Sequence, residues 1–375
     1  MGADAARDPG LRAVGSAFSL PGDFLEGGPY GSGHINDTYV AAYGQAGTRV
    51  RYIHQRINQG VFRDVPGLMD NIRRVAEHQC ARLERVHPGD LSRRVLRPLP
   101  AADGRRFFTD PSGACWRTYY FIEGAKTYDV IESDGQAYAA ARAFGAFQGA
   151  LADLPGARLR ETIPHFHDSP RRFQTLEEAL ASDKAGRAAG CARETDFALA
   201  QKGKVGRLLE LSTAGLLPER VTHNDTKLNN VLLDDATGEG VCVIDLDTVM
   251  PGLAAYDFGD MVRTATMPVA EDERDLGKVV VQWGKFEAIA RGYLSSAGAF
   301  LNRHEKETLA FAGWLMTFEV GIRFLADHLQ GDRYFKVRRE NHNLDRARTQ
   351  FALAQDIERK LGKMSAFIAE IGPHS

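Results

Sequence analysis

The stretch at residues 221–260 constrains the fold of this chain more than any other part of the sequence. Residues 223–230 read HNDTKLNN and fit the pattern H-x-D-x-K-x-x-N. After a turn at residues 234–240, the apolar run VCVI ends in the carboxylate of Asp245. Because apolar runs flank the turn, we expect a hairpin that carries this carboxylate back to the loop around Asp225. The fold must therefore bring two acidic segments to one place.

These residue types suit the transfer of a phosphoryl group from ATP to a hydroxyl. Catalysis of that reaction consists mainly of positioning the acceptor and neutralising charge. Asp225 can accept the hydroxyl proton, and Lys227 places a point charge near the moving group. Asn230 and Asp245 offer the hard oxygen ligands that Mg²⁺ prefers beside phosphates. Such a loop and strand are typical of protein-kinase-like phosphotransferases, and a capped turn with surface carboxylates is the alternative.

Length and composition bound the class of protein. The 375 residues suffice for two lobes, each with its own core. A formal net charge of −2 gives no reason to expect nucleic acid or an anionic membrane as a partner. Four widely spaced cysteines favour reduced thiols in a cytoplasmic protein. No apolar run approaches ~20 residues, so we expect no transmembrane helix. Residues 1–15 lack the apolar core of a signal peptide and are expected to form a flexible leader.

The first lobe, residues 16–122, is expected to bind the nucleotide. Its candidate contacts are Gly31, Ser32, Gly33, Arg56, Phe121 and Ile122. A turn with two glycines lets backbone N–H groups approach phosphates, although an ordinary hairpin turn fits the same residues. The strand that ends at Phe121 and Ile122 runs into a short polar connection. That connection fits a hinge between lobes, where an adenine ring would hydrogen-bond to the backbone.

Arg56 is the best candidate for a cation that binds the α- and β-phosphates, because its strand contains no lysine. An exposed strand arginine is an equal alternative. The helix expected over residues 66–86 offers Asp70 and Glu77 as carboxylates that could pair with this cation. Either could instead be a solvated helix carboxylate, and the sequence does not choose between them.

Three features of the later sequence concern the site less directly. Asp257 and Asp260 are expected to cap the helix that follows them and to hold the loop around Asp225. Arg323 and Asp327 have the spacing of an ion pair on one helix face. The loop at residues 162–170 contains two histidines, at 165 and 167, and an acid. A metal site is one interpretation of that loop, and substrate-side or structural roles are the others.

Longer strings in the chain resemble a known family. DTK at residues 225–227 and VIDLDTVMPG at residues 243–252 resemble the aminoglycoside phosphotransferase and choline kinase superfamily. Within it, the N-acetylhexosamine 1-kinase branch is the most similar. The matching strings are GSGHINDTY (31–39), QRIN (55–58), LMDNI (68–72), FIEGAKTYD (121–129), GIRFLADHLQGDRYFK (321–336) and HNLDRARTQF (342–351). The likeness therefore spans nearly the whole chain.

The resemblance implies an α+β fold with two lobes, as in protein kinases. A small lobe with an antiparallel sheet would cover residues 16–122, and a larger, mainly helical lobe residues 123–375. It implies transfer of the ATP γ-phosphate to the anomeric hydroxyl of N-acetylglucosamine or N-acetylgalactosamine, with Asp225 as base and Mg²⁺ held by Asn230 and Asp245. It also implies sugar contacts from His34, Thr248, Arg323 and Tyr334. Directional donors of this kind suit sugar hydroxyls and an N-acetyl carbonyl.

Two other interpretations stay open. The same chemistry could serve another small acceptor, such as an unacetylated hexose, an aminoglycoside, choline or an amino acid. Polycationic aminoglycosides favour an acidic cleft, whereas the acids at residues 271–275 look like a solvated surface run. A pseudokinase-like binding protein is the other possibility, and the presence of Asp225, Asn230 and Asp245 argues against it. The sequence leaves open the sugar, the choice between ATP and GTP, the number of metal ions and the oligomeric state.

Overall fold

The computed structural model describes residues 10–31, 35–86 and 88–372. The chain divides into two compact units. The sheet unit comprises Met1–Ala125, Asp153–Pro164 and Val241–Met250, and the helical unit comprises Lys126–Ala152, His165–Gly240 and Pro251–Ser375. The expected α+β class, with a β-sheet part near the N-terminus and a larger helical part, is confirmed. The sheet unit contains the whole of residues 16–122 and two later segments, while the lobe boundaries themselves remain a prediction.

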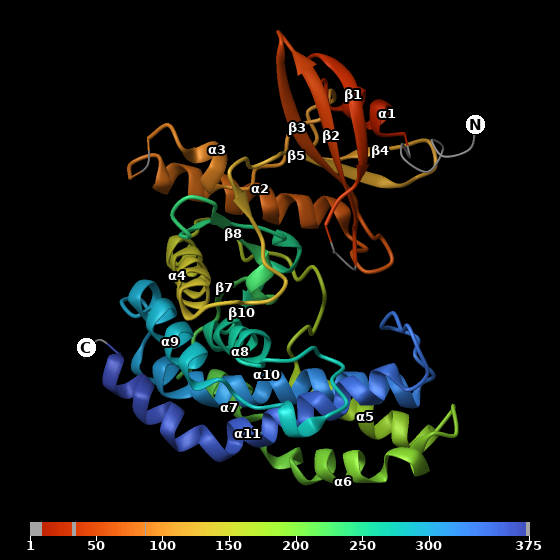
Figure 1. Ribbon diagram of the computed structural model, residues 1–375, viewed down its shortest axis with the longest axis vertical. Coiled ribbons are helices and arrows are strands. Elements are labelled where there is room, and N and C mark those ends of the chain that lie inside the picture. Colours follow the sequence, from red (N-terminus) through yellow and green to blue (C-terminus); the bar gives the residue numbers. More distant parts are fainter. Residues whose placement is uncertain (1–9, 32–34, 87, 373–375) are drawn as a thin grey trace. The chain divides into compact units, whose positions relative to one another are not determined.

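A five-stranded antiparallel sheet forms the centre of the sheet unit (Figure 1). In spatial order its strands are β1 (Asp23–Pro29), β2 (Asp37–Gln45), β3 (Thr48–Arg56), β5 (Cys115–Tyr120) and β4 (Phe108–Thr109). The central strand β3 pairs on both sides, so Gln55 lies opposite Thr38 of β2 and opposite Arg117 of β5. This register places polar side chains of three strands next to one another.

Three helices accompany this sheet: α1 (Leu11–Ala17), α2 (Val65–Leu83) and α3 (Leu91–Arg94). The sequence explains the start of α2, because Asp64 accepts a hydrogen bond from the N–H of Gly67 at 3.0 Å and Pro66 occupies the first turn. Leu68, Ile72 and Val75 are buried along one face of α2. This burial follows the apolar spacing of about 3.6 residues that predicts a helix here.

The expected hairpin around residues 234–240 is present. It consists of β8 (Val231–Asp234) and β9 (Gly240–Val243), and its turn closes with a 2.9 Å hydrogen bond from the N–H of Asp234 to the carbonyl of Glu239. After β9 the chain forms a short 3₁₀ turn, η4 (Leu246–Thr248), and then β10 (Met250–Gly252). Asp245 thus lies two residues after the end of β9, close to the strand end that the sequence indicates.

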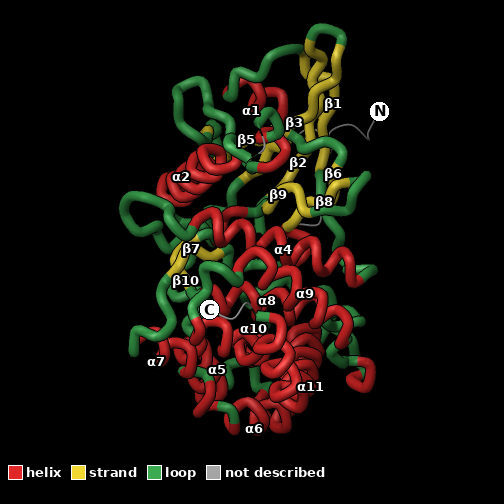
Figure 2. Tube along the Cα trace, turned by 90° about the vertical axis from the view of Figure 1, so that its left-hand side faces the viewer, coloured by secondary structure: helices red, strands yellow, loops and turns green. Residues whose placement is uncertain are grey.

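The helical unit is built from long helices that pack in pairs. Its helices are α4 (Asp134–Leu151), α5 (Ser169–Ser182), α6 (Ala192–Ala200), α7 (Arg207–Thr213), α8 (Ala254–Ala265), α9 (Trp283–Ala297), α10 (Arg303–Leu329) and α11 (His342–Ile371). Short strands are β6 (Ala125–Lys126), at its first residues, and β7 (Arg220–Thr222). Helix α10 packs against α8, α5 and α11, and its pairing with α11 is visible in Figure 2.

Glycine permits the close packing of α4 on α9. A Cβ atom on Gly145 would lie 2.7 Å from the carbonyl oxygen of Tyr293, and one on Gly292 would lie 2.3 Å from that of Tyr138. Neither backbone could accept a side chain without moving. Within the described residues, α10 alone has the length and apolar content of a membrane span, and 89% of that window is buried inside the protein. Its apolar residues therefore belong to the core.

Candidate active site

The catalytic loop, residues 223–230, follows β7 and is held through its backbone by one buried carboxylate. Asp257 of α8 accepts hydrogen bonds from the N–H groups of His223, at 2.9 Å, and Asn224, at 2.7 Å. The hydroxyl of Thr226 donates to the carbonyl of Asp257 at 2.6 Å. The expectation that Asp257 holds this loop is therefore confirmed. Backbone anchoring of this kind fixes the path of the loop whatever its side chains do.

The expectation that Asp257 and Asp260 cap a helix is wrong. Both lie inside α8, which begins at Ala254 and has no side-chain cap at Leu253. Burial raises the pKa of Asp257, although the hydrogen bonds that it accepts from the loop and from Gln148 oppose this. Asp260 instead forms an ion pair with Arg263, at 2.7 Å.

Asp225, Lys227 and Asn230 form a compact polar group within the catalytic loop. Lys227 Nζ lies 3.1 Å from Asp225 Oδ1, and the two side chains are 47% and 24% exposed. Burial alone would raise the pKa of Asp225, but the charges of Lys227 and His223 lower it overall. The carboxylate is therefore ionised at neutral pH and can accept a proton. Asn230 Nδ2 donates to the carbonyl of Asp225 at 2.9 Å, which leaves the amide oxygen of Asn230 for another partner.

Charged side chains outside the loop act on Asp225 and Lys227. Arg263 is buried and pairs with Asp260 and, at 3.2 Å, with Glu271. The Arg263 charge contributes to the lowered pKa of Asp225, and Asp260 contributes to the raised pKa of Lys227. Alternating charges thus favour the ionised forms of both loop side chains.

The metal loop, residues 245–249, belongs to the sheet unit and is held mainly by Asp247. This carboxylate forms an ion pair with Arg117 of β5, whose side chain is 1% exposed, and accepts from Asn36 Nδ2 at 2.6 Å. Thr162 Oγ1 donates to the carbonyl of Asp247 at 2.7 Å. Asp245 itself has a φ of +58°, a left-handed conformation that is strained for a residue other than glycine. The surrounding contacts are strong enough to impose it.

Arg117 is a buried cation that sequence reasoning missed. Its Nε donates to Gln55 Oε1 at 2.9 Å, which follows from the pairing of these two residues across β3 and β5. Burial opposes the charge of Arg117, but Asp247 and Asp245 outweigh this effect and its pKa is raised. Knowledge of the strand pairing would have pointed to Arg117, because it lies opposite Gln55, which belongs to the QRIN string.

Arg56 has a different environment from the one proposed for it. It pairs with Asp37 directly across β2 and β3, at 2.9 Å through Nε, and the two side chains are 46% and 51% exposed. Asp70 and Glu77 both pair with Arg73, at 2.7 and 2.6 Å. The expected pairing of Arg56 with a carboxylate of α2 is therefore wrong. Its contact with nucleotide phosphates remains a prediction.

The other candidate nucleotide contacts are only partly described. Gly31 has a φ of +78°, which favours glycine, whereas Ser32, Gly33 and His34 lie outside the described residues. The N–H of Phe121 donates to the carbonyl of Arg51 at 3.1 Å, and Ile122 is buried. The amide of Phe121 is thus already used, so an adenine contact at this residue would have to use its carbonyl.

Arg323 and Tyr334, the candidate acceptor contacts of the helical unit, lie together. The Arg323 guanidinium is 5.5 Å from the ring centroid of Phe166, 6.0 Å from that of Tyr334 and 5.6 Å from that of Phe335. Within the described part of the chain, Arg323 forms no ion pair or hydrogen bond. Thr248, the remaining candidate, is buried in η4 of the sheet unit.

The expected ion pair between Arg323 and Asp327 is wrong, because Asp327 has other partners. Its carboxylate accepts hydrogen bonds from the N–H groups of Arg333, Tyr334 and Phe335, at 2.9, 2.8 and 3.0 Å. These bonds turn the chain after α10 so that two aromatic rings approach Arg323. The guanidinium is therefore left with unused donors.

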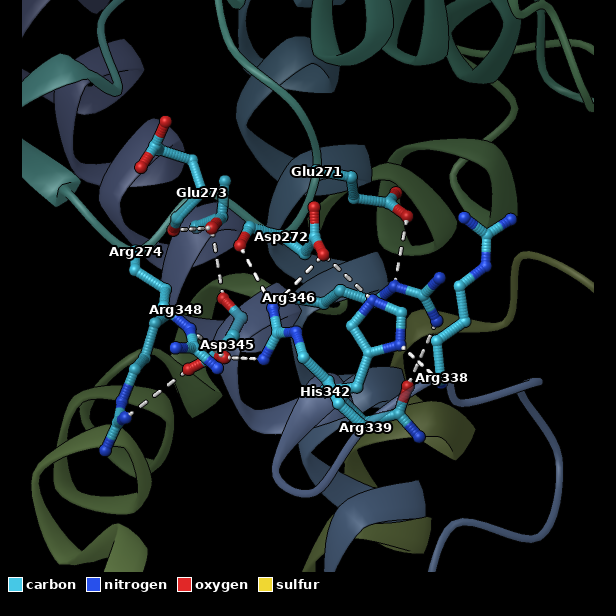
Figure 3. Close-up of polar contacts among 12 residues, drawn as sticks. Glu271, Asp272, Glu273, Arg274, Arg338, Arg339, His342, Asp345, Arg346 and Arg348 are labelled. Atoms are coloured by element: carbon cyan, nitrogen blue, oxygen red, sulfur yellow. Dashed lines mark hydrogen bonds and ion pairs between the residues drawn. The ribbon is translucent and has the colours of Figure 1, made fainter.

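A cluster of ion pairs anchors the far end of the segment that carries Tyr334 (Figure 3). Asp272 pairs with Arg339 and with His342, each at 3.1 Å, and Asp345 pairs with Arg274 at 3.1 Å and also with Arg339. The side chains of Glu271 and Asp272 are 39% and 38% exposed, which agrees with the expected surface run, and both also pair with arginines.

Comparison with known proteins decides the family. A family model described as the phosphotransferase enzyme family (APH) matches residues 26–295. The chain belongs to this family. The expected superfamily and the expected class of enzyme, a phosphotransferase, are thereby confirmed, while the N-acetylhexosamine branch remains a prediction.

Solved structures of similar fold agree with the assignment of this chain to the phosphotransferase family. An aminoglycoside phosphotransferase from Alicyclobacillus acidocaldarius has a TM-score of 0.58 at 12% identity, over 96% of both chains. A choline kinase from Cryptosporidium parvum has a TM-score of 0.54 at 13% identity, over 94% of this chain and 96% of that one. A spectinomycin phosphotransferase, solved with ADP and spectinomycin, has a TM-score of 0.52 at 15% identity, over 94% and 98%. At these identities the likeness shows the fold.

The oxygen donors of the phosphotransferase fit a magnesium ion. Within the described residues Asn230 keeps its amide oxygen available in the helical unit, and Asp245 has a carboxylate in the sheet unit. Two protein ligands are typical for Mg²⁺, which retains water and binds substrate phosphates. Within residues 10–31, 35–86 and 88–372, no group of three or more His, Cys, Asp or Glu side chains could hold a metal. The meeting of Asn230 and Asp245 at one ion remains a prediction.

Proposed function

We propose that this phosphotransferase moves the γ-phosphate of ATP to the anomeric hydroxyl of an N-acetylhexosamine. The observation that carries the proposal is the state of Asp225. This carboxylate is ionised, lies 3.1 Å from Lys227 Nζ and stands on a loop whose backbone Asp257 fixes. A positioned base next to a cation is what transfer to a hydroxyl requires of the protein.

Each residue has a distinct task in this proposal. Asp225 accepts the proton of the acceptor hydroxyl as the oxygen attacks phosphorus. Lys227 stabilises negative charge that accumulates on the moving phosphoryl group. Asn230 and Asp245 hold Mg²⁺, which neutralises the phosphates of ATP when it is bound. The spectinomycin phosphotransferase of similar fold was solved with ADP, which supports a nucleotide as the co-substrate here.

Arg323 and Tyr334 support a sugar as the acceptor. A guanidinium carries five N–H donors, and those of Arg323 form no hydrogen bond within the described residues. The aromatic rings around it offer a flat apolar surface, and a sugar ring presents both hydroxyls and C–H groups. The acetamido group and the reaction at C1 come from the resemblance to N-acetylhexosamine 1-kinases. A cytoplasmic location fits the proposed use of ATP.

An acceptor panel tests this function. Purified protein with ATP and Mg²⁺ is incubated with N-acetylglucosamine, N-acetylgalactosamine, glucose, galactose, choline, serine and kanamycin, and ADP release is measured. We expect an N-acetylhexosamine to give the highest kcat/KM and a product whose phosphorus couples to the anomeric proton. A product with phosphate on another oxygen would contradict transfer to C1. Preference for choline, serine or kanamycin would replace the sugar with another acceptor of the same chemistry.

Asp225→Asn tests the mechanism. Without a base the acceptor oxygen keeps its proton, so we expect kcat to fall on the order of 10²- to 10⁴-fold. The dissociation constant of ADP with Mg²⁺, measured by calorimetry, should change little, because Asp225 is not one of the proposed metal ligands. Asp235→Asn, at an exposed carboxylate in the turn between β8 and β9, is the matched control and should keep normal turnover. Undiminished phosphorylation by Asp225→Asn would remove Asp225 from the mechanism.

A further inference from the structure

His167 occupies a buried position between the catalytic loop and α10. Its Nε2 lies 3.0 Å from the carbonyl oxygen of Asn224, and its Nδ1 lies 2.9 Å from Glu319 Oε1. The His167 side chain is 6% exposed and that of Glu319 is 0% exposed. The rings of Phe166 and Tyr256 lie tilted against the imidazole, with centroids 4.6 and 5.0 Å from its own. The ring is therefore bound at both nitrogens and packed against two aromatic rings.

The two partners of this ring determine where its protons are. A carbonyl oxygen only accepts hydrogen bonds, so Nε2 must carry a hydrogen. The other nitrogen faces a carboxylate whose second oxygen accepts from the hydroxyl of Ser169. Burial alone would raise the pKa of Glu319, but His167 and its other partners lower it overall. A lowered pKa favours the ionised carboxylate, which only accepts hydrogen bonds, and in that state Nδ1 carries a hydrogen as well.

One further carboxylate and two guanidiniums lie near the ring. Asp168 is adjacent in sequence, and Arg323 lies one helical turn beyond Glu319 and contributes to its lowered pKa. Arg172 of α5 donates to the carbonyl of Phe166 at 3.0 Å. Burial raises the pKa of Tyr256, so this phenol stays neutral. Glu319 is the carboxylate in direct contact with the ring.

The contact with Asn224 bears directly on Asp225. Asn224 has a φ of +64°, a left-handed conformation that Asn adopts more readily than most residues, and its N–H is bound to Asp257. The carbonyl that His167 binds belongs to the peptide whose nitrogen is that of Asp225. Rotation of the peptide between Asn224 and Asp225 would turn the Asp225 side chain. The hydrogen bond from His167 to the Asn224 carbonyl opposes this rotation.

We propose that His167 is a positioning residue of the phosphotransfer site that works as an imidazolium, held by Glu319 and donating to the Asn224 carbonyl. Its effect is to hold the orientation of the peptide before Asp225. This inference rests on the proposed role of Asp225 as the base. No proton or phosphoryl group passes through His167 in this scheme, and the ring remains doubly protonated throughout the cycle.

Nitrogen NMR of the histidine rings tests the protonation state without any assay of activity. The full-length protein is labelled with ¹⁵N in its histidine rings, and the His167 signals are assigned by their loss in His167→Asn. We expect two protonated ring nitrogens for His167 at pH 7. In Glu319→Gln we expect one protonated nitrogen, Nε2, because the charge that stabilises the second proton is gone. A bare ring nitrogen at His167 in the unmodified protein would overturn the proposal.

Kinetics test the positioning role. In His167→Asn we expect kcat to fall on the order of 10- to 100-fold, because a misplaced base lowers the rate of chemistry. The KM for ATP should stay within about twofold, whereas general loss of folded protein would lower the active fraction and the thermal midpoint. His165→Asn is the matched control, in the same loop, and should keep kcat. Asn is chosen because it tolerates the φ of +57° at position 165.

The outcomes separate this inference from the proposed function. If the unmodified protein phosphorylates no acceptor, the proposed function fails, and the ring-nitrogen spectrum still decides the state of His167. If transfer occurs and His167→Asn keeps kcat within about twofold, the positioning role is overturned while the function stands. If His167→Asn does not fold, Glu319→Gln takes its place. A lower kcat with unchanged ATP KM then supports the proposal, and an unchanged kcat overturns it.

Discussion

The catalytic loop and the metal loop are held by different physical means. Backbone groups anchor the catalytic loop: Asp257 accepts from two of its amides, and His167 donates to one of its carbonyls. In the metal loop most of the anchoring comes from one side chain: the Asp247 carboxylate is bound by Arg117 and by Asn36. The catalytic loop is therefore anchored at several backbone positions, whereas the metal loop depends mainly on one buried ion pair.

Burial makes that dependence severe. Two charges taken out of water repay their desolvation only when they remain together, and loss of one partner leaves an uncompensated charge. Arg117 is 1% exposed and Asp247 3% exposed, so water cannot replace either partner. A loop anchored in this way is rigid while the pair is intact and fails as a unit when the pair is broken.

Arg117→Met should therefore have the largest effect on the sheet unit. We expect a loss of about 3–5 kcal/mol in the free energy of unfolding, because Asp247 is left buried without its partner. Urea unfolding followed by circular dichroism measures this loss. The double variant Arg117→Met/Asp247→Leu should regain much of the stability but not the activity, because the metal loop has still lost its anchor. Equal stability of the single and double variants would show that the buried charge is not the cause.

Acid should lower the stability of the sheet unit, because this unit contains the buried histidine His54. Burial lowers the pKa of His54 from 6.5 to about 4, its Nδ1 is bound to Thr118 Oγ1 at 2.8 Å, and its Nε2 has no partner within the described residues. Below pH 6.5 the imidazole of His54 binds a proton in the unfolded chain, whereas in the folded chain it stays neutral until the pH falls to about 4. Stability should therefore fall between pH 6.5 and about 4, by roughly 3 kcal/mol from this residue.

Thermal midpoints between pH 7 and pH 4 check this expectation. His54→Gln should be less stable than the unmodified protein at pH 7 but should lose less on acidification. His304→Gln, at an exposed histidine of α10, is the matched control and should keep the normal pH dependence. An unchanged acid response in His54→Gln would assign the loss to other groups.

Local features of the fold were predictable from the sequence. The hairpin from β8 to β9 and the position of Asp225, Lys227 and Asn230 on one loop follow from residues close together in the chain. The α+β class was implied by the resemblance of long strings in the chain to a known superfamily. The hairpin and the loop depend on short-range spacing, which a sequence displays directly.

The partners of charged residues were not predictable in the same way. Arg56 binds Asp37 and Arg117 binds Asp247 because of strand register, which the sequence does not state. Asp327 has the spacing to pair with Arg323, but backbone amides of the following turn occupy it. His167 reaches a glutamate 152 positions away in sequence. Each of these partners is chosen by tertiary packing, and helix spacing alone would select another.

Arg56→Gln should have the smallest effect on stability and gives the sharpest contrast with Arg117. Its pair with Asp37 is about half exposed on both sides, so water and salt screen it, and we expect a loss of less than about 1 kcal/mol in the free energy of unfolding. If Arg56 also binds nucleotide phosphates, the KM for ATP should rise several-fold at low salt, with less change at high salt. Asp37→Asn is the matched control, because it breaks the same pair and leaves the cation in place. Equal ATP KM values for Arg56→Gln and the unmodified enzyme would leave Arg56 as an exposed strand arginine and make Arg117 the functional cation of this sheet.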